Sequence, residues 1–264
     1  MKTTLSVIGS CRVFTPINRL ARRGITHTAH GGAEWYTHST RDVLQKIKIV
    51  RNQLIPSEAD VPMIVETYPQ KWQPSNHHPD FFKGTDVFIV EICSRKIFSK
   101  NGIYFQQWCA QGALNNQGND ATATSQTESM ITRVQAQIEV RKDLKLICDR
   151  LNKPVIFVGH INTKMTDGNP FPERVIIHNL LRDFCNEDAR ATFFDPTVYI
   201  KEFGEEVALV DSGHYRPEFN DVIGDRLWEC ARSILGKSDI TDRTTTASAT
   251  MNSQEFRSPI AVAS

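Results

Sequence analysis

Asp86-Val87-Phe88-Ile89-Val90-Glu91-Ile92 is the stretch that decides the fold. Its hydrophobicity is nearly continuous rather than alternating, which is typical of a strand buried on both faces of a parallel sheet. Apolar, β-rich runs at residues 4–9, 155–159 and 191–194 predict further strands of the same kind. Because parallel neighbours need crossover connections, helices are expected between these strands.

The spacing of apolar residues predicts those helices. Ser39 or Thr40 can cap one of them, and Lys153-Pro154 ends another before the strand at 155–159. Helices are predicted at 16–23, 40–54, 128–151, 173–186 and 217–235, with a short helix starting at Asp195-Pro196, a strand at 61–66 and loops at 72–83 and 113–127. The pattern predicts an α/β fold with a doubly wound, mostly parallel sheet of about five strands in a three-layer sandwich.

Length and composition favour one domain. The chain has 264 residues, of which 40% are apolar, enough for one substantial core. Residues 237–264 are rich in Ser, Thr and Ala without periodic apolar positions. We therefore predict a domain over 1–236 and a disordered tail over 237–264.

Charge and hydropathy exclude several classes of partner. The formal net charge is +1, so no global field recruits nucleic acid or an anionic membrane. No run reaches the roughly 18 apolar residues that a membrane span needs, and the N-terminal apolar stretch is too short for a secretory signal. The six cysteines form no CxxC pair. We expect a cytoplasmic protein with reduced thiols and no nucleic-acid or membrane partner, and its oligomeric state is left open.

The candidate chemistry lies after the strands, because open α/β sheets bind ligands beyond the carboxyl ends of their strands. These ends carry Gly9-Ser10-Cys11-Arg12, then Cys93-Ser94-Arg95, then His160, and finally Asp211-Ser212-Gly213-His214 before the last helix. A thiol or hydroxyl nucleophile needs a base within hydrogen-bond reach, and that base needs an acceptor on its other ring nitrogen. Cys11 or Ser10, His214 and Asp211 supply these three groups.

The two outer blocks resemble the SGNH (GDSL-like) hydrolase superfamily over roughly residues 4–235. In that superfamily the first strand ends in Gly-Asp-Ser, whose serine is the nucleophile, and a late Asp-x-x-His supplies base and orienting acid. Gly9-Ser10-Cys11 places Cys11 at the serine's position, and Asp211-Ser212-Gly213-His214 matches the last block. The Gly-Ser-Cys variant is similar to GSCFA-type and WcbI-like capsule-biosynthesis relatives, some of which look like acyltransferases.

One block of the superfamily departs here. The family's Gly-x-Asn-Asp, which supplies an oxyanion-hole asparagine, is replaced by Cys93-Ser94-Arg95-Lys96. We expect the backbone N–H groups of Cys11 and Gly32, with Ser94 or Arg95, to meet the developing charge instead. We expect Arg12 and the helix dipole to promote the Cys11 thiolate. His160 is interpreted either as a substrate-binding residue that faces the cleft or as a core or rim histidine.

The resemblance implies an esterase or an O-acyltransferase that acts on a glycan or small hydroxylated substrate. No cofactor or metal motif is visible, and acyl-CoA is the co-substrate we consider. A catalytically silent SGNH-like ligand-binding domain is the alternative. The histidines at positions 27, 30, 38, 77 and 78 are interpreted as surface-loop residues rather than metal ligands. Glu91, an acid inside an apolar strand, is expected to pair with Arg12 or Arg95.

Overall fold

The structure, a computed structural model, describes residues 2–29, 35–65, 82–116, 127–163 and 168–251. At its centre lies a five-stranded sheet in the order β2-β1-β3-β7-β8, in which every pairing is parallel. The predicted α/β fold is therefore confirmed. The strands are β1 (Thr4–Ile8), β2 (His27–Thr28), β3 (Val87–Ile92), β7 (Val155–Gly159) and β8 (Ala191–Phe194).

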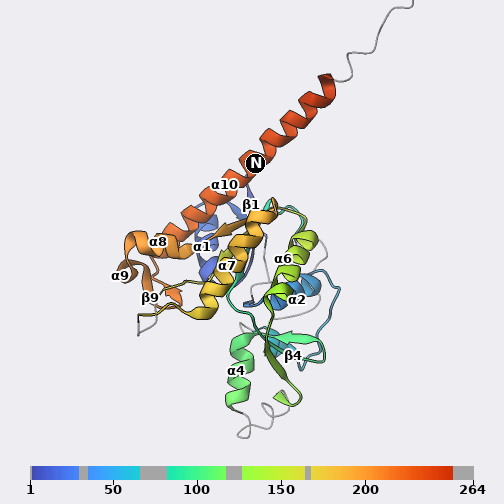
Figure 1. Cartoon of the computed structure of the whole chain (residues 1–264), viewed down its shortest axis with the longest axis vertical. Helices are drawn as coiled ribbons and strands as arrows, with labels where there is room; N and C mark the ends of the chain where they lie inside the picture. Colours follow the sequence, from blue (N-terminus) through green and yellow to red (C-terminus); the bar gives the residue numbers. More distant parts are fainter. Residues whose placement is uncertain (1, 30–34, 66–81, 117–126, 164–167, 252–264) are drawn as a thin grey trace, which may run out of the picture.

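Helices cover both faces of this sheet (Figure 1). Val87 and Ile89 of β3 point to one face, whereas Phe88 and Val90 point to the other, and all four are buried. The first face is covered by α1 (Cys11–Arg22), α8 (Pro196–Phe203), α9 (Glu205–Ala208) and α10 (Phe219–Met251), and the second by α2 (Thr40–Val50), α6 (Gln137–Leu151) and α7 (Pro172–Glu187). β3 is thus the doubly buried strand that its sequence predicts.

Side-chain caps fix where three of these helices begin. Ser10 caps α1, so this helix starts at Cys11, earlier than the Pro16 start that the sequence suggested. Ser39 caps α2 and forms a capping box with Asp42, as its position before an amphipathic run predicts. Asp195 accepts a hydrogen bond from the Thr197 backbone and caps α8. Each cap residue directly precedes its helix and thereby fixes the residue at which that helix begins.

The structure contains a subdomain that the sequence did not predict, formed mostly by the chain after β3. It contains a three-stranded antiparallel sheet in the order β5-β4-β6, with two helices packed on it. A separate apolar core, which includes Trp35, Phe98 and Phe105, holds it together. Its elements are α3 (Val61–Ile64), β4 (Lys96–Lys100), β5 (Ile103–Phe105), α4 (Gln107–Asn115) and β6 (Ile131–Val134).

This subdomain corrects three sequence-based expectations. The helix expected from residue 128 begins only at Gln137, because residues 131–134 pair antiparallel with β4. Residues 61–64 are helical rather than extended, since Pro62 is well placed in a first helical turn. The loop expected at 113–127 starts inside α4, and its residues 117–126 lie outside the described part, as do residues 72–81 of the other predicted loop.

A two-stranded hairpin and a long helix end the described chain. The hairpin pairs β9 (Leu209–Asp211) with β10 (His214–Tyr215). Helix α10 begins at Phe219 and continues to Met251, beyond the end at Leu235 that the sequence predicted, and Figure 1 shows it leaving the body of the domain. No helix in the described ranges is long and apolar enough to cross a membrane. The domain boundary at residue 236 stays a prediction.

Candidate active site

The carboxyl ends of β1 and β3 lie side by side and form the floor of the candidate site. Leu5 to Ile8 pair in register with Val87 to Val90, so the chain leaves both strands at one edge. This edge is the switch point of the sheet, since β2 and β3 lie on opposite sides of β1. A Cβ on Gly9 would lie 2.7 Å from Cβ of Glu91, so only glycine permits this approach.

Ser10 braces the turn after β1. Its side chain is buried, and its Oγ donates a 2.5 Å hydrogen bond to Oε2 of Glu91. The same carboxylate oxygen accepts a 2.8 Å hydrogen bond from the Ser10 backbone N–H. Ser10 Oγ in turn accepts a hydrogen bond from the Arg12 backbone. These contacts engage Ser10 in stabilising the turn.

Glu91 forms a buried ion pair with Arg12. Nε of Arg12 lies 2.6 Å from Oε1 of Glu91, and the glutamate is fully buried. Burial alone would raise the pKa of Glu91, but the Arg12 charge and the hydrogen bonds from Ser10 and Arg12 outweigh it and lower that pKa. The predicted partnership of Glu91 with an arginine is confirmed, and Arg12 is the arginine.

Arg12 also links segments that lie far apart in the sequence. Its Nη1 donates a 3.2 Å hydrogen bond to the carbonyl oxygen of Gly213, and its Nη2 lies 3.1 Å from Sγ of Cys93. The guanidinium therefore contacts the end of β3 and the β9–β10 turn together. This contact brings the turn at Gly213 to the ends of β1 and β3.

His214 and Asp211 form a hydrogen-bonded pair in that turn. Nδ1 of His214 lies 2.9 Å from both carboxylate oxygens of Asp211, and both side chains are more than half exposed. The Gly213 backbone N–H donates a 2.7 Å hydrogen bond to the same carboxylate. This backbone contact and His214 lower the pKa of Asp211, which keeps it an anionic acceptor. Because Asp211 engages Nδ1, the Nε2 atom of the imidazole is the ring nitrogen that can exchange a proton with another group.

Cys11 is the first residue of α1, and its side chain is half-buried. No hydrogen bond joins it to His214, although the structure describes both residues. Burial raises the pKa of the thiol; Arg12 opposes this effect and Glu91 adds to it. The expected promotion of the thiolate is therefore wrong, because Glu91 offsets the charge of Arg12 and desolvation dominates.

The side chains of Ser94 and Arg95 are engaged elsewhere. Ser94 Oγ accepts a 2.9 Å hydrogen bond from the Lys96 backbone. Arg95 forms a two-pronged pair with Glu173 of α7, at 2.7 and 3.0 Å, and also donates to the Gln135 carbonyl. Their proposed contribution to an oxyanion hole stays a prediction. Gly32, the other proposed contributor, lies outside the described residues.

His160 and Arg174 both contact the carbonyl oxygen of Ile161, and Arg174 also contacts the turn that precedes His214. Nδ1 of His160 contacts the Ile161 carbonyl at 2.9 Å, and burial together with Arg12 lowers the pKa of this imidazole well below its usual value. Nη1 of Arg174 donates hydrogen bonds to the carbonyls of Ile161, at 2.7 Å, and Ser212, at 2.9 Å. Burial and Arg12 lower the pKa of Arg174 to about 10. His160 is thus neutral, and Arg174 holds the turn that carries His214.

His38 is a site residue that the sequence interpretation missed. It was assigned to a surface loop, yet it is buried, and its carbonyl accepts hydrogen bonds from the backbones of Cys93 and Ser94. Burial and the Arg12 charge lower the pKa of its imidazole to about 4. His27 is exposed as expected, whereas residues 30, 77 and 78 lie outside the described part. In the sequence, the position of His38 directly before the helix cap Ser39 was the signal that could have indicated a fixed, buried residue.

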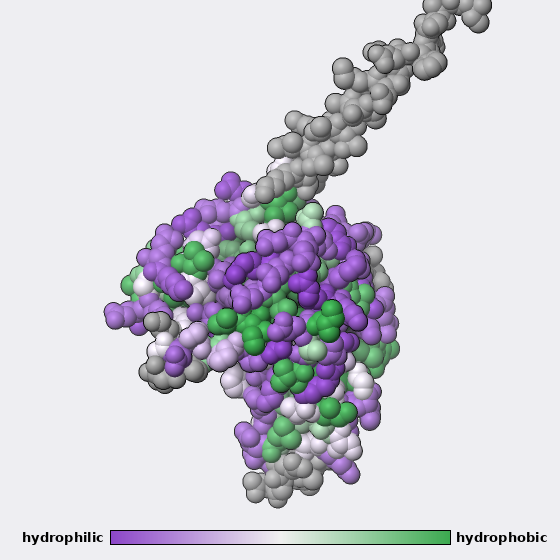
Figure 2. All heavy atoms as spheres, viewed as in Figure 1, coloured by the Kyte–Doolittle hydropathy of each residue, from purple (hydrophilic) through white to green (hydrophobic). Residues whose placement is uncertain are grey.

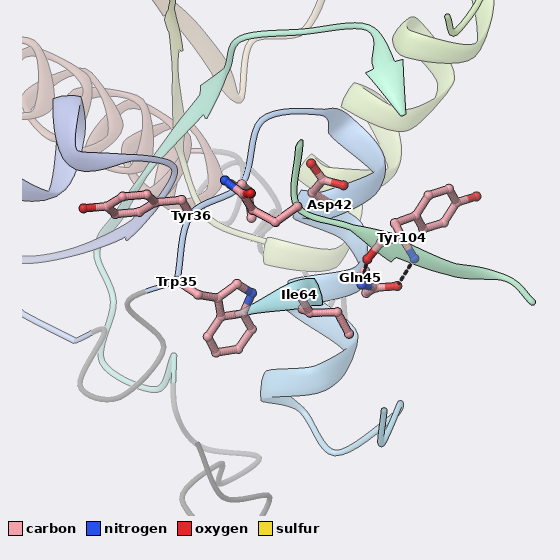
Figure 3. A pocket seen from close by; sticks show the side chains of 8 residues that line it. Trp35, Tyr36, Asp42, Gln45, Ile64 and Tyr104 are labelled. Carbon is pink, nitrogen blue, oxygen red and sulfur yellow. Dashed lines mark hydrogen bonds between the residues drawn. The ribbon is translucent and has the colours of Figure 1, made fainter. Parts of the chain in front are cut away.

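A small cavity lies beyond His38, at the junction of the main domain and the subdomain (Figure 3). Its volume is about 10 Å³, room for one water. Gln106 contacts Nδ1 of His38 at 3.4 Å, and Gln45 bonds both backbone groups of Tyr104. Burial raises the pKa of Asp42 to about 6. The lining residues are Trp35, Tyr36, Thr37, Asp42, Gln45, Ile64, Tyr104 and Gln106.

The described residues of the candidate site supply side chains suited to acid–base and nucleophilic chemistry. No group of three or more His, Cys, Asp or Glu side chains in those ranges is arranged to hold a metal ion. The groups that do converge are one thiol, one imidazole–carboxylate pair and the buried Arg12–Glu91 pair. This set resembles the parts of a nucleophilic acyl-transfer site.

Comparison with known proteins places the chain in a family. The Vi polysaccharide biosynthesis protein TviD of Salmonella typhi is 21% identical over 263 residues, which covers 85% of this chain and 30% of that protein. The chain thus spans less than a third of this relative's length. The crystal structure of an acetyl xylan esterase, AlAXEase, aligns with a TM-score of 0.45 and 11% identity over 86% of this chain and 98% of that chain. A model of the TviD N-terminal domain matches residues 3–127 and 127–230, and the chain belongs to that family.

Proposed function

We propose that this protein is an acyl-transfer enzyme that acts on a glycan or small hydroxylated substrate through a thioester on Cys11. One observation carries the proposal: the His214–Asp211 pair is formed, and Arg12 ties its turn to the turn that bears Cys11. The name of the relative, a polysaccharide biosynthesis protein, favours a glycan as acyl acceptor. The Gly-Ser-Cys and Asp-x-x-His blocks resemble those of SGNH enzymes.

The proposed first step forms the thioester. With Nδ1–H directed at Asp211, Nε2 of His214 takes the proton of the Cys11 thiol as Sγ adds to the acyl carbonyl carbon. The tetrahedral intermediate then expels the leaving group, an alkoxide or the thiolate of acyl-CoA, which receives that proton from His214. Because burial raises the pKa of Cys11, attack requires this proton transfer rather than a pre-formed thiolate.

The proposed second step transfers the acyl group. A glycan hydroxyl loses its proton to Nε2 of His214 and attacks the thioester, and the Cys11 thiolate leaves and is reprotonated. If water replaces the hydroxyl, the same steps give an esterase. The Cys11 backbone N–H lies at the open start of α1 and donates no hydrogen bond to any described residue. It is the donor we assign to the oxyanion, with the remaining donors left to Gly32, Ser94 or Arg95.

A ligand-binding domain without catalysis is the second candidate. The absence of a hydrogen bond between the described residues Cys11 and His214, together with the raised thiol pKa, favours it. The replacement of the family's oxyanion asparagine by Cys93-Ser94-Arg95 favours it as well.

Intact-protein mass spectrometry separates the two functions. The full chain is exposed to acetyl-CoA and, in parallel, to an activated acetyl ester, and the acylated peptide is mapped. An enzyme gains one acetyl group on Cys11 and then loses it, either to an added acceptor glycan or by hydrolysis. It fails to gain the acetyl group when His214 is replaced by alanine. A chain that stays unmodified under both donors, or that is labelled equally without His214, would overturn the enzymatic proposal.

A further inference from the structure

A second pocket lies away from the catalytic turns, between α2, α6 and the turn that joins β4 to β5. Its volume is about 200 Å³. Arg41 and Lys48 reach it from α2, Arg150 from α6, and Gly102 and Tyr104 from the β4–β5 hairpin. Tyr104 and Gln45 also line the small cavity beside His38 (Figure 3), and these shared residues make the two spaces neighbours.

The charged side chains of this pocket are all positive. Its lining contains Arg41, Lys48 and Arg150 but no Asp or Glu. Arg51, at the end of α2, lies close enough for the positive charge of Arg150 to add to burial in lowering the pKa of Arg51. The whole chain has a net charge of only +1, so this concentration of cations is a local feature.

The protein itself provides little compensation for these charges. Among the described residues, Lys48, Arg51 and Arg150 form no ion pair with a carboxylate, and Nε of Arg150 is buried without a hydrogen-bond partner. Arg41 lies 2.9 Å from Asp143, but that carboxylate also accepts hydrogen bonds from Thr40 and Gln135. Figure 2 shows hydrophilic side chains interspersed with several hydrophobic patches on the face over α6 and α7.

Like charges gathered in one pocket repel, and a buried donor without a partner costs free energy, so an anion would relieve both penalties. Two guanidinium groups and one ammonium group match a multiply charged phosphate better than a single carboxylate, because guanidinium donors pair with phosphate oxygens two at a time. We propose that the pocket between Arg41, Lys48 and Arg150 binds the phosphate group of a phosphorylated ligand.

Leucines complete the wall and indicate what the phosphate is attached to. Leu44, Leu54 and Leu146 line the same pocket as the three cations. An apolar or aromatic portion next to the phosphate would contact them, as in a nucleotide-linked acyl donor or a nucleotide-linked sugar. Both sources share the phosphate chemistry, and the proposal does not depend on the nucleophile of the catalytic turn.

Isothermal titration calorimetry on the full chain with inorganic pyrophosphate tests the proposal. Wild-type protein is expected to bind it with an affinity that falls as salt rises. Arg150→Gln and Lys48→Gln, which change residues on two different helices, are expected to weaken binding at least tenfold each. Lys201→Gln removes an exposed positive charge from α8 on the other face of the sheet and is the matched control, expected to bind as the wild type does.

Competition then identifies the source of the phosphate. Displacement of pyrophosphate by coenzyme A would support an acyl donor, and displacement by a uridine diphosphate sugar would support a sugar donor or acceptor. Removing an unpaired cation should leave the melting temperature of ligand-free protein unchanged or higher, which checks that the variants fold. Equal pyrophosphate binding by all four proteins, or binding of a polycarboxylate but not of pyrophosphate, would overturn the proposal.

Discussion

Nε of Arg12 lies 2.6 Å from Oε1 of Glu91, and this pair is the buried centre of the candidate site. The same guanidinium reaches Gly213, 201 positions further along the chain. The ion pair therefore links the ends of β1 and β3 to the turn that carries His214. Its removal should affect stability and site geometry together.

We predict that Glu91→Gln destabilises the fold by about 3–5 kcal/mol, because it leaves the Arg12 charge buried without its counter-ion. Chemical denaturation of the purified chain measures this change. Glu173→Gln is the control. Glu173 pairs with Arg95 but is more than half exposed, and ion pairs at the surface contribute about 0–1 kcal/mol. A loss for Glu91→Gln no larger than that of the control would contradict a structural role for the buried pair.

Local patterns account for what the sequence could predict here. Continuous hydrophobicity in residues 87–92 predicted a doubly buried strand, and Asp211 and His214 pair within three residues of chain. The β4–β6 pairing could not be predicted in the same way. Residues 131–134 are exposed and have no strand periodicity of burial, so only their partner β4 makes them a strand.

The electrostatics of the site depended on contacts between distant segments. The charge of Arg12 near Cys11 was predictable from adjacency, but the burial that outweighs it, and the opposing charge of Glu91, required knowing that β3 lies beside β1. Likewise, the burial of His38 results from its packing against the end of β3 and the subdomain, which nothing in residues 35–39 specifies. Tertiary burial, rather than residue type, decided these two pKa values.

The buried His38 predicts a specific pH dependence of stability. Its pKa is about 4 in the fold and about 6.5 in an unfolded chain, so the unfolded state binds more protons between these values. Its contribution to the free energy of unfolding is present above about pH 6.5 and falls by about 3 kcal/mol as the pH drops to 4. His38→Asn should flatten this slope in pH-resolved denaturation, whereas the exposed His27→Asn should leave it unchanged. Parallel slopes for the two variants would disprove the assignment.

Arg174 is expected to position His214 rather than to touch substrate. It donates to the Ser212 carbonyl within the Asp211–His214 turn, and its guanidinium lies 3.9 Å from the centre of the Phe171 ring. Arg174→Gln should slow acyl labelling of Cys11 by about tenfold or more, because small displacements of a catalytic group are costly. Half-saturating donor concentration should change little. Arg182→Gln, exposed on the same helix, is the control, and a change in donor affinity alone would refute the positioning role.

The stable domain is expected to end near residue 236. In the part of α10 whose side chains the structure describes, residues 219–236, the buried apolar residues are Phe219, Ile223, Leu227 and Ala231. A chain stopped after Gly236 should therefore lose less than about 0.5 kcal/mol, as for changes outside the core. A melting temperature markedly below that of the full chain would show that the segment beyond residue 236 contributes to the fold.

Cys11 and Ser10 are adjacent, and the structure gives them opposite expected phenotypes. Ser10 Oγ donates to the buried Glu91 carboxylate, so Ser10→Ala should cost about 1–3 kcal/mol of stability while labelling remains measurable. Cys11 is the residue at the open start of α1, so Cys11→Ala should abolish labelling and turnover with little loss of stability. His214→Ala should slow both by two to four orders of magnitude, about the contribution of a general base. Melting temperatures and acyl labelling measured on the same preparations separate these effects. If Ser10→Ala is folded but unlabelled while Cys11→Ala is active, Ser10 is the nucleophile; if both are labelled normally, the covalent mechanism is wrong.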